Sequence, residues 1–188
     1  MRRILLIPVS LVLLLAVATP ALAATEVQTF TTHSMHGPIQ AATDGCPEAC
    51  TEYLLSAASI ERTPEQSFAC LEVNTYTSDG VFTERGCGDA SDVVIVASGK
   101  LTLTLLPIDI TLDSGRTVTV SATATSISRP LTEKFRDQFV DADGCTVTTK
   151  VVSHEAEFSA LATVTVDGIS ADGGGTVFTS ERKITTRC

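Results

Sequence analysis

Tryptophan is missing from the sequence, and tyrosine occurs only at Tyr53 and Tyr76. The aromatic platform on which sugar-binding sandwiches stack their ligands is therefore weakly supplied. Positive charge is scarce as well, because 13 Lys and Arg stand against 22 Asp and Glu. Two of the cations lie in the first three residues, so eleven cations and 22 acids follow them, a net charge of −11. Such a chain repels phosphate backbones and anionic lipid surfaces, and no nucleic acid is expected among its partners.

The motifs of common catalytic sites are missing too. No Gly-x-Ser-x-Gly elbow is present, and the cysteines show neither the Cys-x-x-Cys spacing nor the βαβ context of a redox centre. Histidine occurs at three positions, and His154, next to Glu155, is the one candidate base inside the expected fold. A non-catalytic role is therefore expected. The alternative is a secreted hydrolase, which a cleft joining His154 to a carboxylate and a hydroxyl would reveal.

Residues 1–23 have the anatomy of a cleavable secretory signal peptide. An arginine pair precedes an apolar run over residues 4–17, and an Ala-x-Ala cleavage site ends at Ala23. The run is too short to span a bilayer comfortably, so no transmembrane segment is expected after cleavage. Of the 188 residues, 165 remain, which is enough for one domain. The sequence thus predicts a secreted, extracellular protein.

Alternation of apolar and polar residues indicates β-strands along most of the remaining chain. In RTVTVSATATSI, residues 116–127, valine and alanine alternate with threonine, the period of two of a half-buried strand. KLTLTLL, residues 100–106, does the same. Short strands separated by Asp-Gly and Gly-rich turns are typical of antiparallel sandwiches. We expect an all-β fold, a single antiparallel β-sandwich or barrel-like domain over residues 44–188, stapled by disulfides.

Three segments are less regular. Residues 24–43 are polar and Thr-rich without a period, and we expect a polar leader there. The segment from Glu52 to Ile60 fits a strand, which we favour, but Tyr53, Leu54 and Ala57 also fit a helical stripe. Residues 129–144 crowd charges around two phenylalanines. They predict a solvated edge strand, with a partner-binding edge as the alternative.

Similar hairpin sequences recur in the second half of the chain. LTLTLL begins at residue 101 and LATVTV at residue 161, and they are followed by GRTVTVS and GGTVFTS. This repetition predicts two similar hairpin units that pack face to face as the two sheets of a sandwich. Turns are expected at the Gly-rich runs, including residues 171–175.

All six cysteines follow the signal, and an even number in an oxidising compartment predicts three disulfides. If Ser78 and Asp79 form a hairpin loop, Cys70 falls opposite Cys87 as a non-hydrogen-bonded pair within disulfide reach. An Asp-Gly loop would instead place Glu72 opposite Cys87 and require a bulge.

The other pairings follow from position. Cys145 lies just after a turn and Cys188 is the last residue, so their bond would tie the last strand into the sheet. By elimination Cys46 joins Cys50. Because such a close bridge can be strained, exchange among Cys46, Cys50 and Cys70 remains an alternative.

Metal ligands of the soft type gather near the start of the exported chain. The segment HSMHGPIQAATDGCPEAC contains His33, His36, Cys46 and Cys50, residue types that suit copper or zinc. Its spacing matches no zinc template, and its thiols are expected to be oxidised. No cofactor is therefore expected, and an exported metal-binding protein using these four residues is an alternative.

Calcium is the other metal to consider. Asp141 and Asp143 stand in DADG, and Asp79, Asp167 and Asp172 occupy further turn-like runs. Carboxylates are suitable calcium ligands, but the EF-hand pattern is not met. Aspartate is also a common turn residue, and a structural role is the expected one.

A resemblance adds to this interpretation. In DGCTVTTKVVSHEAEFSALATVTVDG and the preceding GRTVTVSATATSISRPL, the chain resembles a group of uncharacterised secreted bacterial proteins that are β-rich and cysteine-bearing. The resemblance covers residues 51–168 in pattern, and it implies fold class and export but no activity. The expected function is a non-catalytic module that binds a surface, a matrix or a partner protein.

Overall fold

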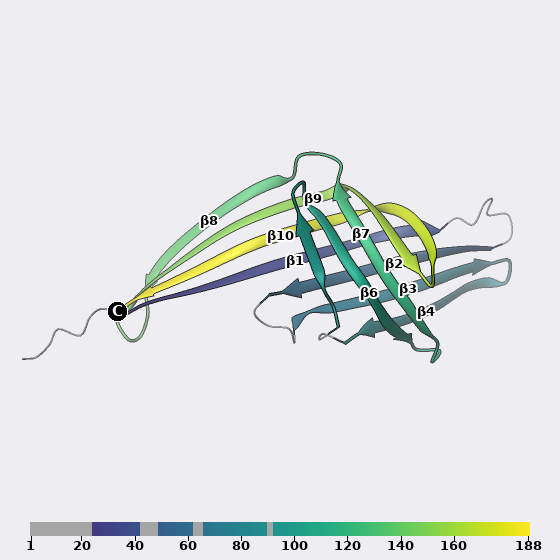
Figure 1. Cartoon of the computed structure of the whole chain (residues 1–188), viewed down its shortest axis with the longest axis horizontal. Coiled ribbons are helices and arrows are strands. Elements are labelled where there is room, and N and C mark those ends of the chain that lie inside the picture. The colour runs from purple at the N-terminus through teal and green to yellow at the C-terminus, as the bar shows by residue number, and fades with distance from the viewer. Residues whose placement is uncertain (1–23, 42–48, 62–65, 90–91) are drawn as a thin grey trace, which may run out of the picture.

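The computed structural model describes residues 24–41, 49–61, 66–89 and 92–188. These residues form ten strands, every pairing between them is antiparallel, and the described ranges contain no helix (Figure 1). The all-β antiparallel prediction is therefore confirmed, whereas the predicted signal peptide lies outside the described residues. The strands are β1 Thr25–Ala41, β2 Ala49–Ile60, β3 Phe68–Thr77, β4 Gly80–Gly88, β5 Ile95–Ser98, β6 Thr102–Leu112, β7 Thr117–Ser126, β8 Leu131–Val140, β9 Thr146–Val166 and β10 Ile169–Arg187.

The sheet closes on itself in a barrel-like ring. Its order is β10-β1-β2-β3-β4-β6-β7-β9, and β9 pairs again with β10. The narrowest join is between β4 and β6, where only two residue pairs are formed. Strand β5 attaches to β6 and strand β8 to β9, so these two strands lie off the ring.

One half of each of the long strands β1, β9 and β10 extends beyond the ring. Figure 1 shows β1, β8, β9 and β10 running together to the end of the molecule where the C-terminus lies. We call this four-stranded sheet the arm; it comprises residues 25–34, 131–140, 146–155 and 178–187. None of its side chains is buried. The arm is therefore a single layer whose two faces are exposed or half-buried, and the remainder of the molecule is called the barrel.

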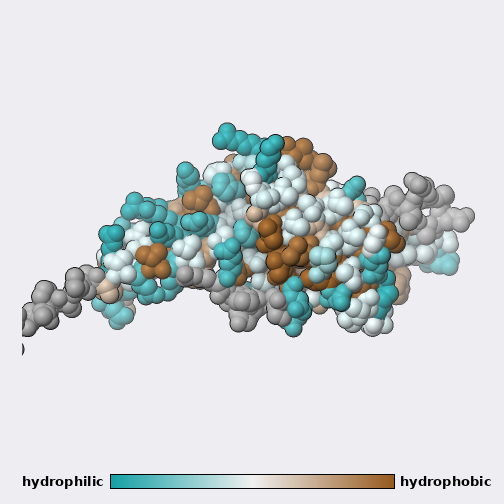
Figure 2. Space-filling model, viewed as in Figure 1, coloured by the Kyte–Doolittle hydropathy of each residue, from teal (hydrophilic) through white to brown (hydrophobic). Residues whose placement is uncertain are grey.

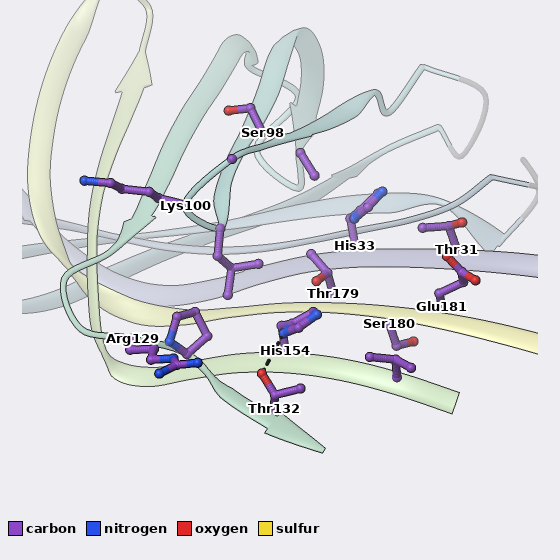
Figure 3. Close-up of a pocket in the computed structure, with 15 residues that line it drawn as sticks. Thr31, His33, Ser98, Lys100, Arg129, Thr132, His154, Thr179, Ser180 and Glu181 are labelled. Carbon is purple, nitrogen blue, oxygen red and sulfur yellow. Dashed lines mark hydrogen bonds between the residues drawn. The ribbon is translucent and has the colours of Figure 1, made fainter. Parts of the chain in front are cut away.

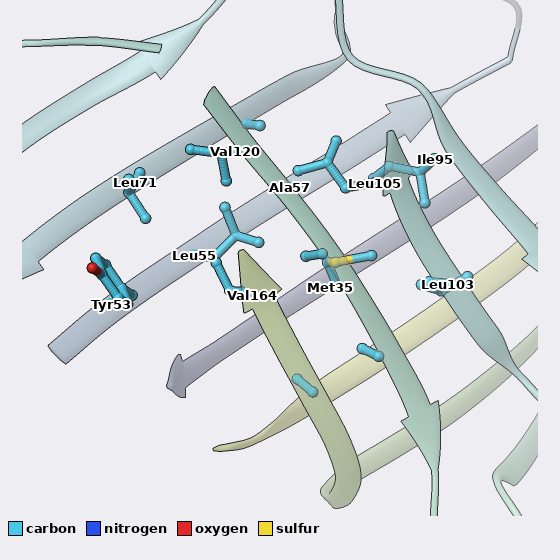
Figure 4. Close-up of a cluster of buried hydrophobic side chains, with 14 of the residues drawn as sticks. Met35, Tyr53, Leu55, Ala57, Leu71, Ile95, Leu103, Leu105, Val120 and Val164 are labelled. Carbon is cyan, nitrogen blue, oxygen red and sulfur yellow. The ribbon is translucent and has the colours of Figure 1, made fainter. Parts of the chain in front are cut away.

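The hydrophobic core lies inside the barrel. Strands β6, β7 and the second half of β9 cross over β1 and β2 there, and the enclosed side chains come from both layers (Figure 4). The predicted alternation is confirmed in β6 and β7, whose inward positions are buried. Full burial of each such aliphatic side chain contributes about 1.5–3 kcal/mol. The largest fully buried side chains are Leu55, Leu71, Leu103, Leu105, Ile110, Val118, Val120, Val164 and Val177.

The segment from Glu52 to Ile60 is a strand, as favoured. It forms most of β2, pairs with β1 and β3, and buries Tyr53, Leu55 and Ala57 in alternation. Position 54, which the helical stripe would have buried, is only half-buried. The burial of every second side chain therefore identifies this segment as a strand and not a helix.

The polar leader predicted at residues 24–43 is wrong for residues 25–41, which form β1 between β10 and β2. The physical reason lies in the arm. Over residues 25–34 both faces of β1 are at least partly exposed to solvent, so neither face needs apolar side chains. The alternation that signals a strand is therefore absent. The strand is held by backbone pairing with its two neighbours.

Two further expectations about the second half are corrected. The similar hairpins β6–β7 and β9–β10 do not pack face to face; β7 pairs with β9 directly, so the hairpins lie side by side. The glycines of residues 171–175 form no turn but belong to β10. The turn is at Asp167 and Gly168, both with positive φ.

The predicted disulfides are confirmed where the structure describes both cysteines. Ser78 and Asp79 form the loop of the β3–β4 hairpin, and Cys70 lies opposite Cys87 with their Cα atoms 4.0 Å apart in a disulfide. Cys145 and Cys188 form the second bond at the tip of the arm. Cys50 is also disulfide-bonded. Cys46 lies outside the described residues.

A pair of glycines marks the place where the arm joins the barrel. The register of β1 and β10 sets Gly37 opposite Gly175, between the pairs His36↔Thr176 and Ile39↔Gly173. A Cβ atom on Gly37 would lie 2.9 Å from the Cα of Gly175, and a Cβ atom on Gly175 would lie equally close to Gly37. The two backbones therefore approach at a distance that only glycine permits.

We predict that Gly175→Ala lowers the free energy of unfolding by about 1–3 kcal/mol, because the two strands must separate to admit the methyl group. Urea denaturation followed by circular dichroism measures the change. Gly174→Ala is the matched control, since the nearest atom to its Cβ would be the Ala160 carbonyl oxygen at 3.8 Å. Equal losses in both variants would contradict the close approach.

Candidate functional site

The main cleft lies where the arm meets the barrel. It has a volume of about 650 Å³ and opens between one face of the arm and the turn that joins β5 to β6. Figure 3 shows side chains of β1, β9 and β10 directed towards the loop that carries Ser98 and Lys100. The polar and charged lining residues are Thr31, His33, Ser98, Lys100, Arg129, Thr132, His154, Thr179, Ser180 and Glu181.

Strand register brings two distant histidines into this cleft. Thr132 of β8 pairs with His154, His154 pairs with Thr179, and Thr179 pairs with His33. Cross-strand partners in an antiparallel sheet share a face. The four side chains therefore form one row across the arm, with an imidazole on β9 and another on β1.

His154 is held by a neighbouring hydroxyl. Its Nδ1 atom and the Oγ1 atom of Thr132 are hydrogen-bonded at 2.9 Å (Figure 3). This bond orients the ring, and Glu181 supplies a carboxylate in the lining of the same cleft. The cleft thus contains a base, a hydroxyl and a carboxylate, the three groups expected if the protein is a hydrolase.

His33 is more deeply placed. Its side chain is only 12% exposed, and its Nε2 atom lies 3.9 Å from Oε1 of Glu61. The Nδ1 atom is buried and has no hydrogen-bond partner within the described part of the chain. A buried polar atom of this kind costs free energy unless another group satisfies it.

The cleft differs in charge from the molecule that carries it. Lys100 and Arg129 line it together with the two imidazoles, whereas Glu181 is the one carboxylate among its described lining residues, with the Glu61 carboxylate next to His33. Residues 24–188 carry an excess of eleven negative charges. A cationic cleft in such a protein favours a ligand with negative charge.

The predicted soft-metal ligands separate in the structure. His33 and His36 are three residues apart on β1, so they point to opposite faces of the sheet. His33 enters the cleft, whereas Nδ1 of His36 is hydrogen-bonded to the Ser56 hydroxyl of β2. Cys50 is oxidised and Cys46 lies outside the described residues. Metal binding by this region stays a prediction.

The aspartates proposed for calcium are spread over several turns. Asp141 and Asp143 lie in the β8–β9 turn at the tip of the arm, where Oδ1 of Asp141 accepts the backbone N–H of Asp143 at 3.0 Å. Asp79 is in the β3–β4 turn at the far end of the barrel (Figure 1). Among the residues that the structure places, no group of three or more His, Cys, Asp or Glu is suited to hold a metal ion.

A second polar cluster lies outside the cleft. The Glu84 carboxylate accepts hydrogen bonds from the Ser114 hydroxyl and, at 2.8 Å, from Arg116, whose other terminal nitrogen is 4.0 Å from Asp167. The Ser114 and Arg116 hydrogen bonds hold the pKa of Glu84 below its ordinary value of 4.5. Burial raises the pKa of nearby Tyr53 above 10.0. The cluster joins β4 to two turns, which indicates a structural role.

Two comparisons with known proteins found no match: no protein-family model matches the chain, and no curated protein matches it either. The part of the chain that the structure describes has no helix with the length and apolar character needed to cross a membrane. The function of the protein is therefore inferred from the geometry of the cleft and the arm.

Sequence reasoning named His33 and His154 but did not place them together, and it missed Lys100 and Arg129. The alternation of each strand shows which of its residues share a face. It does not show which strands are neighbours, because that depends on pairing between distant segments.

We predict that Glu84→Gln lowers stability at pH 7 by about 1–3 kcal/mol, through loss of two charge-assisted hydrogen bonds. Because the pKa of Glu84 is depressed in the folded state, this contribution is present above the ordinary pKa and is lost as the pH falls through the folded pKa. The difference between wild type and variant should therefore shrink from about pH 6 towards pH 3. Denaturation at each pH measures it, with Glu133→Gln on exposed β8 as the control. A difference that stays constant would contradict the proposed role.

Proposed function

We propose that this protein is an exported, non-catalytic binding module that holds its ligand in the cleft between arm and barrel. The observation that carries the proposal is the convergence of His33 and His154, from strands far apart in sequence, on one 650 Å³ cleft. Hydroxyls and imidazoles there offer both donors and acceptors of hydrogen bonds. The buried Nδ1 of His33 is a polar atom with no hydrogen-bond partner among the described residues.

Export is supported by two independent features. Residues 1–23 have the charged, apolar and small-residue regions of a secretory signal. The two disulfides described, one in the barrel and one in the arm, belong to an oxidising compartment. The ligand is accordingly expected outside the cell.

The first test uses the three histidines as probes. We expect the imidazole NMR signals of His33 and His154 to shift when a panel of sugar acids, sulfated sugars, neutral sugars and acidic amino acids is added in turn. His36 is the internal control, because it points to the other face of the sheet and bonds Ser56. Single His→Gln variants assign the three signals. If no compound moves His33 and His154, or if His36 moves as far, the cleft is not the binding site.

Ester hydrolysis is the second candidate, and the Thr132–His154 hydrogen bond favours it. In this reaction Oγ1 of Thr132 would attack an ester carbonyl while its proton passes to Nδ1 of His154, which then protonates the departing alcohol. Water, losing a proton to the same nitrogen, would then cleave the acyl-threonine ester, and this would release the acid and restore the Thr132 hydroxyl. Among the described residues, however, no carboxylate is hydrogen-bonded to His154 to orient it for this task. Binding is therefore the better supported function.

The two functions are separated by an activity measurement. A hydrolase should release nitrophenol from p-nitrophenyl acetate faster than its Thr132→Val variant, by about a hundredfold or more if Thr132 is the nucleophile. Thr179→Val, in the same row but without the bond to His154, is the control. If the protein is a binding module, wild type and the Thr132→Val variant should release nitrophenol at the same rate. A rate that falls only in the Thr132 variant would support the hydrolase.

A further inference from the structure

The two faces of the arm differ sharply in charge. Register places Arg136 of β8 opposite Lys150 of β9, and Lys150 opposite Lys183 of β10. These three cations form one row across neighbouring strands, on the same face as His33 and His154. Lys134 and Arg187 lie on that face too, because they are an even number of residues away from Arg136 and Lys183. We call these five cations and the side chains around them the cationic face.

Acids are concentrated on the opposite face. The cationic face has one acid, Glu181, for its five cations. The opposite face has one cation, Arg182, and its acids are Glu26, Glu133, Asp137 and Glu155. Lys100 and Arg129 border the cleft at the root of the cationic face, so seven of the eleven exported cations gather in one region. The negative charge of the whole chain conceals this distribution.

The row of like charges is not compensated within the protein. Arg136, Lys150 and Lys183 are exposed, and none of the five cations forms an ion pair with another described residue. Neighbouring strands are about 4.8 Å apart, and like charges directly opposite each other destabilise a sheet. An anionic partner would remove this repulsion.

The chemistry of the face favours one kind of partner. Its remaining side chains are mostly threonines, which hydrogen-bond to hydroxyl, carboxylate and sulfate groups, and apart from the imidazoles of His33 and His154 none has an aromatic ring. A single-stranded nucleic acid would need aromatic rings on which to stack its bases. A membrane would need apolar side chains, and the exposed phenylalanines Phe135 and Phe139 lie on the opposite face. In Figure 2 hydrophilic residues predominate over the arm, with separate hydrophobic spots.

We infer that the cationic face binds a linear acidic polysaccharide, with one acidic sugar residue in the cleft and the chain running along the arm. This inference rests on the proposed binding function and names its ligand class. Across the strands the charges of the row are about 4.8 Å apart; along the strands, Lys134 and Arg136 are about 6.8 Å apart and Lys183 and Arg187 are separated by about twice that distance. A stiff polymer with regularly spaced carboxylates or sulfates matches such a rigid array. The cations bind its charged groups, and the threonines bind its hydroxyls.

The test compares polymers on the full mature protein with its disulfides intact. Polygalacturonate and dextran sulfate are the probes, with neutral dextran, poly-glutamate and vesicles of anionic lipid as comparators, measured by biolayer interferometry. We expect both acidic polysaccharides to bind, and binding to weaken as salt rises. Equal binding of neutral dextran, or stronger binding of poly-glutamate or vesicles, would overturn the inference.

The site is located by charge reversal. The triple variant Arg136→Glu, Lys150→Glu, Lys183→Glu should bind the acidic polysaccharides about tenfold more weakly or worse. Arg182→Glu is the matched control, a cation of the same arm on the opposite face, and should stay within about twofold. Thermal melting checks that each variant folds. Equal losses in the triple variant and the control would show that binding depends on overall charge, contrary to the inference.

The two proposals can fail separately. If a small ligand shifts His33 and His154 but no acidic polysaccharide binds, the cleft is a binding site and the inferred ligand class is wrong. If polysaccharide binding depends on the row of cations but leaves both imidazole signals unmoved, the cationic face binds and the cleft does not.

Discussion

The antiparallel pairing of β9 with β10 is the constraint on which both parts of the structure depend. It runs from the turn at Asp167 and Gly168 to the pair Thr146↔Arg187, with one irregularity next to Gly175. In the half next to the turn the two strands complete the barrel, and in the half further from the turn they extend away from the core. Backbone N–H and C=O groups of a strand need partners whether or not a core lies beneath them. Strands β1 and β8 supply these partners, and the four-stranded arm is the result.

Hydrophobic burial and exposed charge are thereby divided between the two parts. The barrel buries the aliphatic side chains, whereas the arm gains little from the hydrophobic effect and is fastened by Cys145–Cys188 at its tip. Strand β8 is the exposed edge of the arm, and its charges oppose pairing with a second copy of the protein. If two β8 strands paired antiparallel about Phe135, Lys134 of each strand would lie opposite Arg136 of the other. A sheet with two wet faces can present acids on one and cations on the other, which suits it for binding.

Predictions from the sequence succeeded where one face of a strand is buried. β6 and β7 alternate because Leu103 and Val120 must face the core, and the two-residue loop of the β3–β4 hairpin set Cys70 opposite Cys87. They failed at β1, whose arm half has no buried face and therefore no apolar period. The glycines near residue 175 predict a turn but lie within β10, because composition does not distinguish a turn from a close crossing of backbones.

The sequence by itself determined the fold class, most of the strand-forming segments and the Cys70–Cys87 disulfide, because alternation and hairpin length are local properties of the chain. Only the tertiary structure decided which strands are neighbours, and with that which side chains meet. His33 and His154 share a cleft, and Arg136, Lys150 and Lys183 share a row, through the pairing of β8, β9, β10 and β1. Pairing of this kind depends on free energy summed over long-range contacts, and no single segment contains that information.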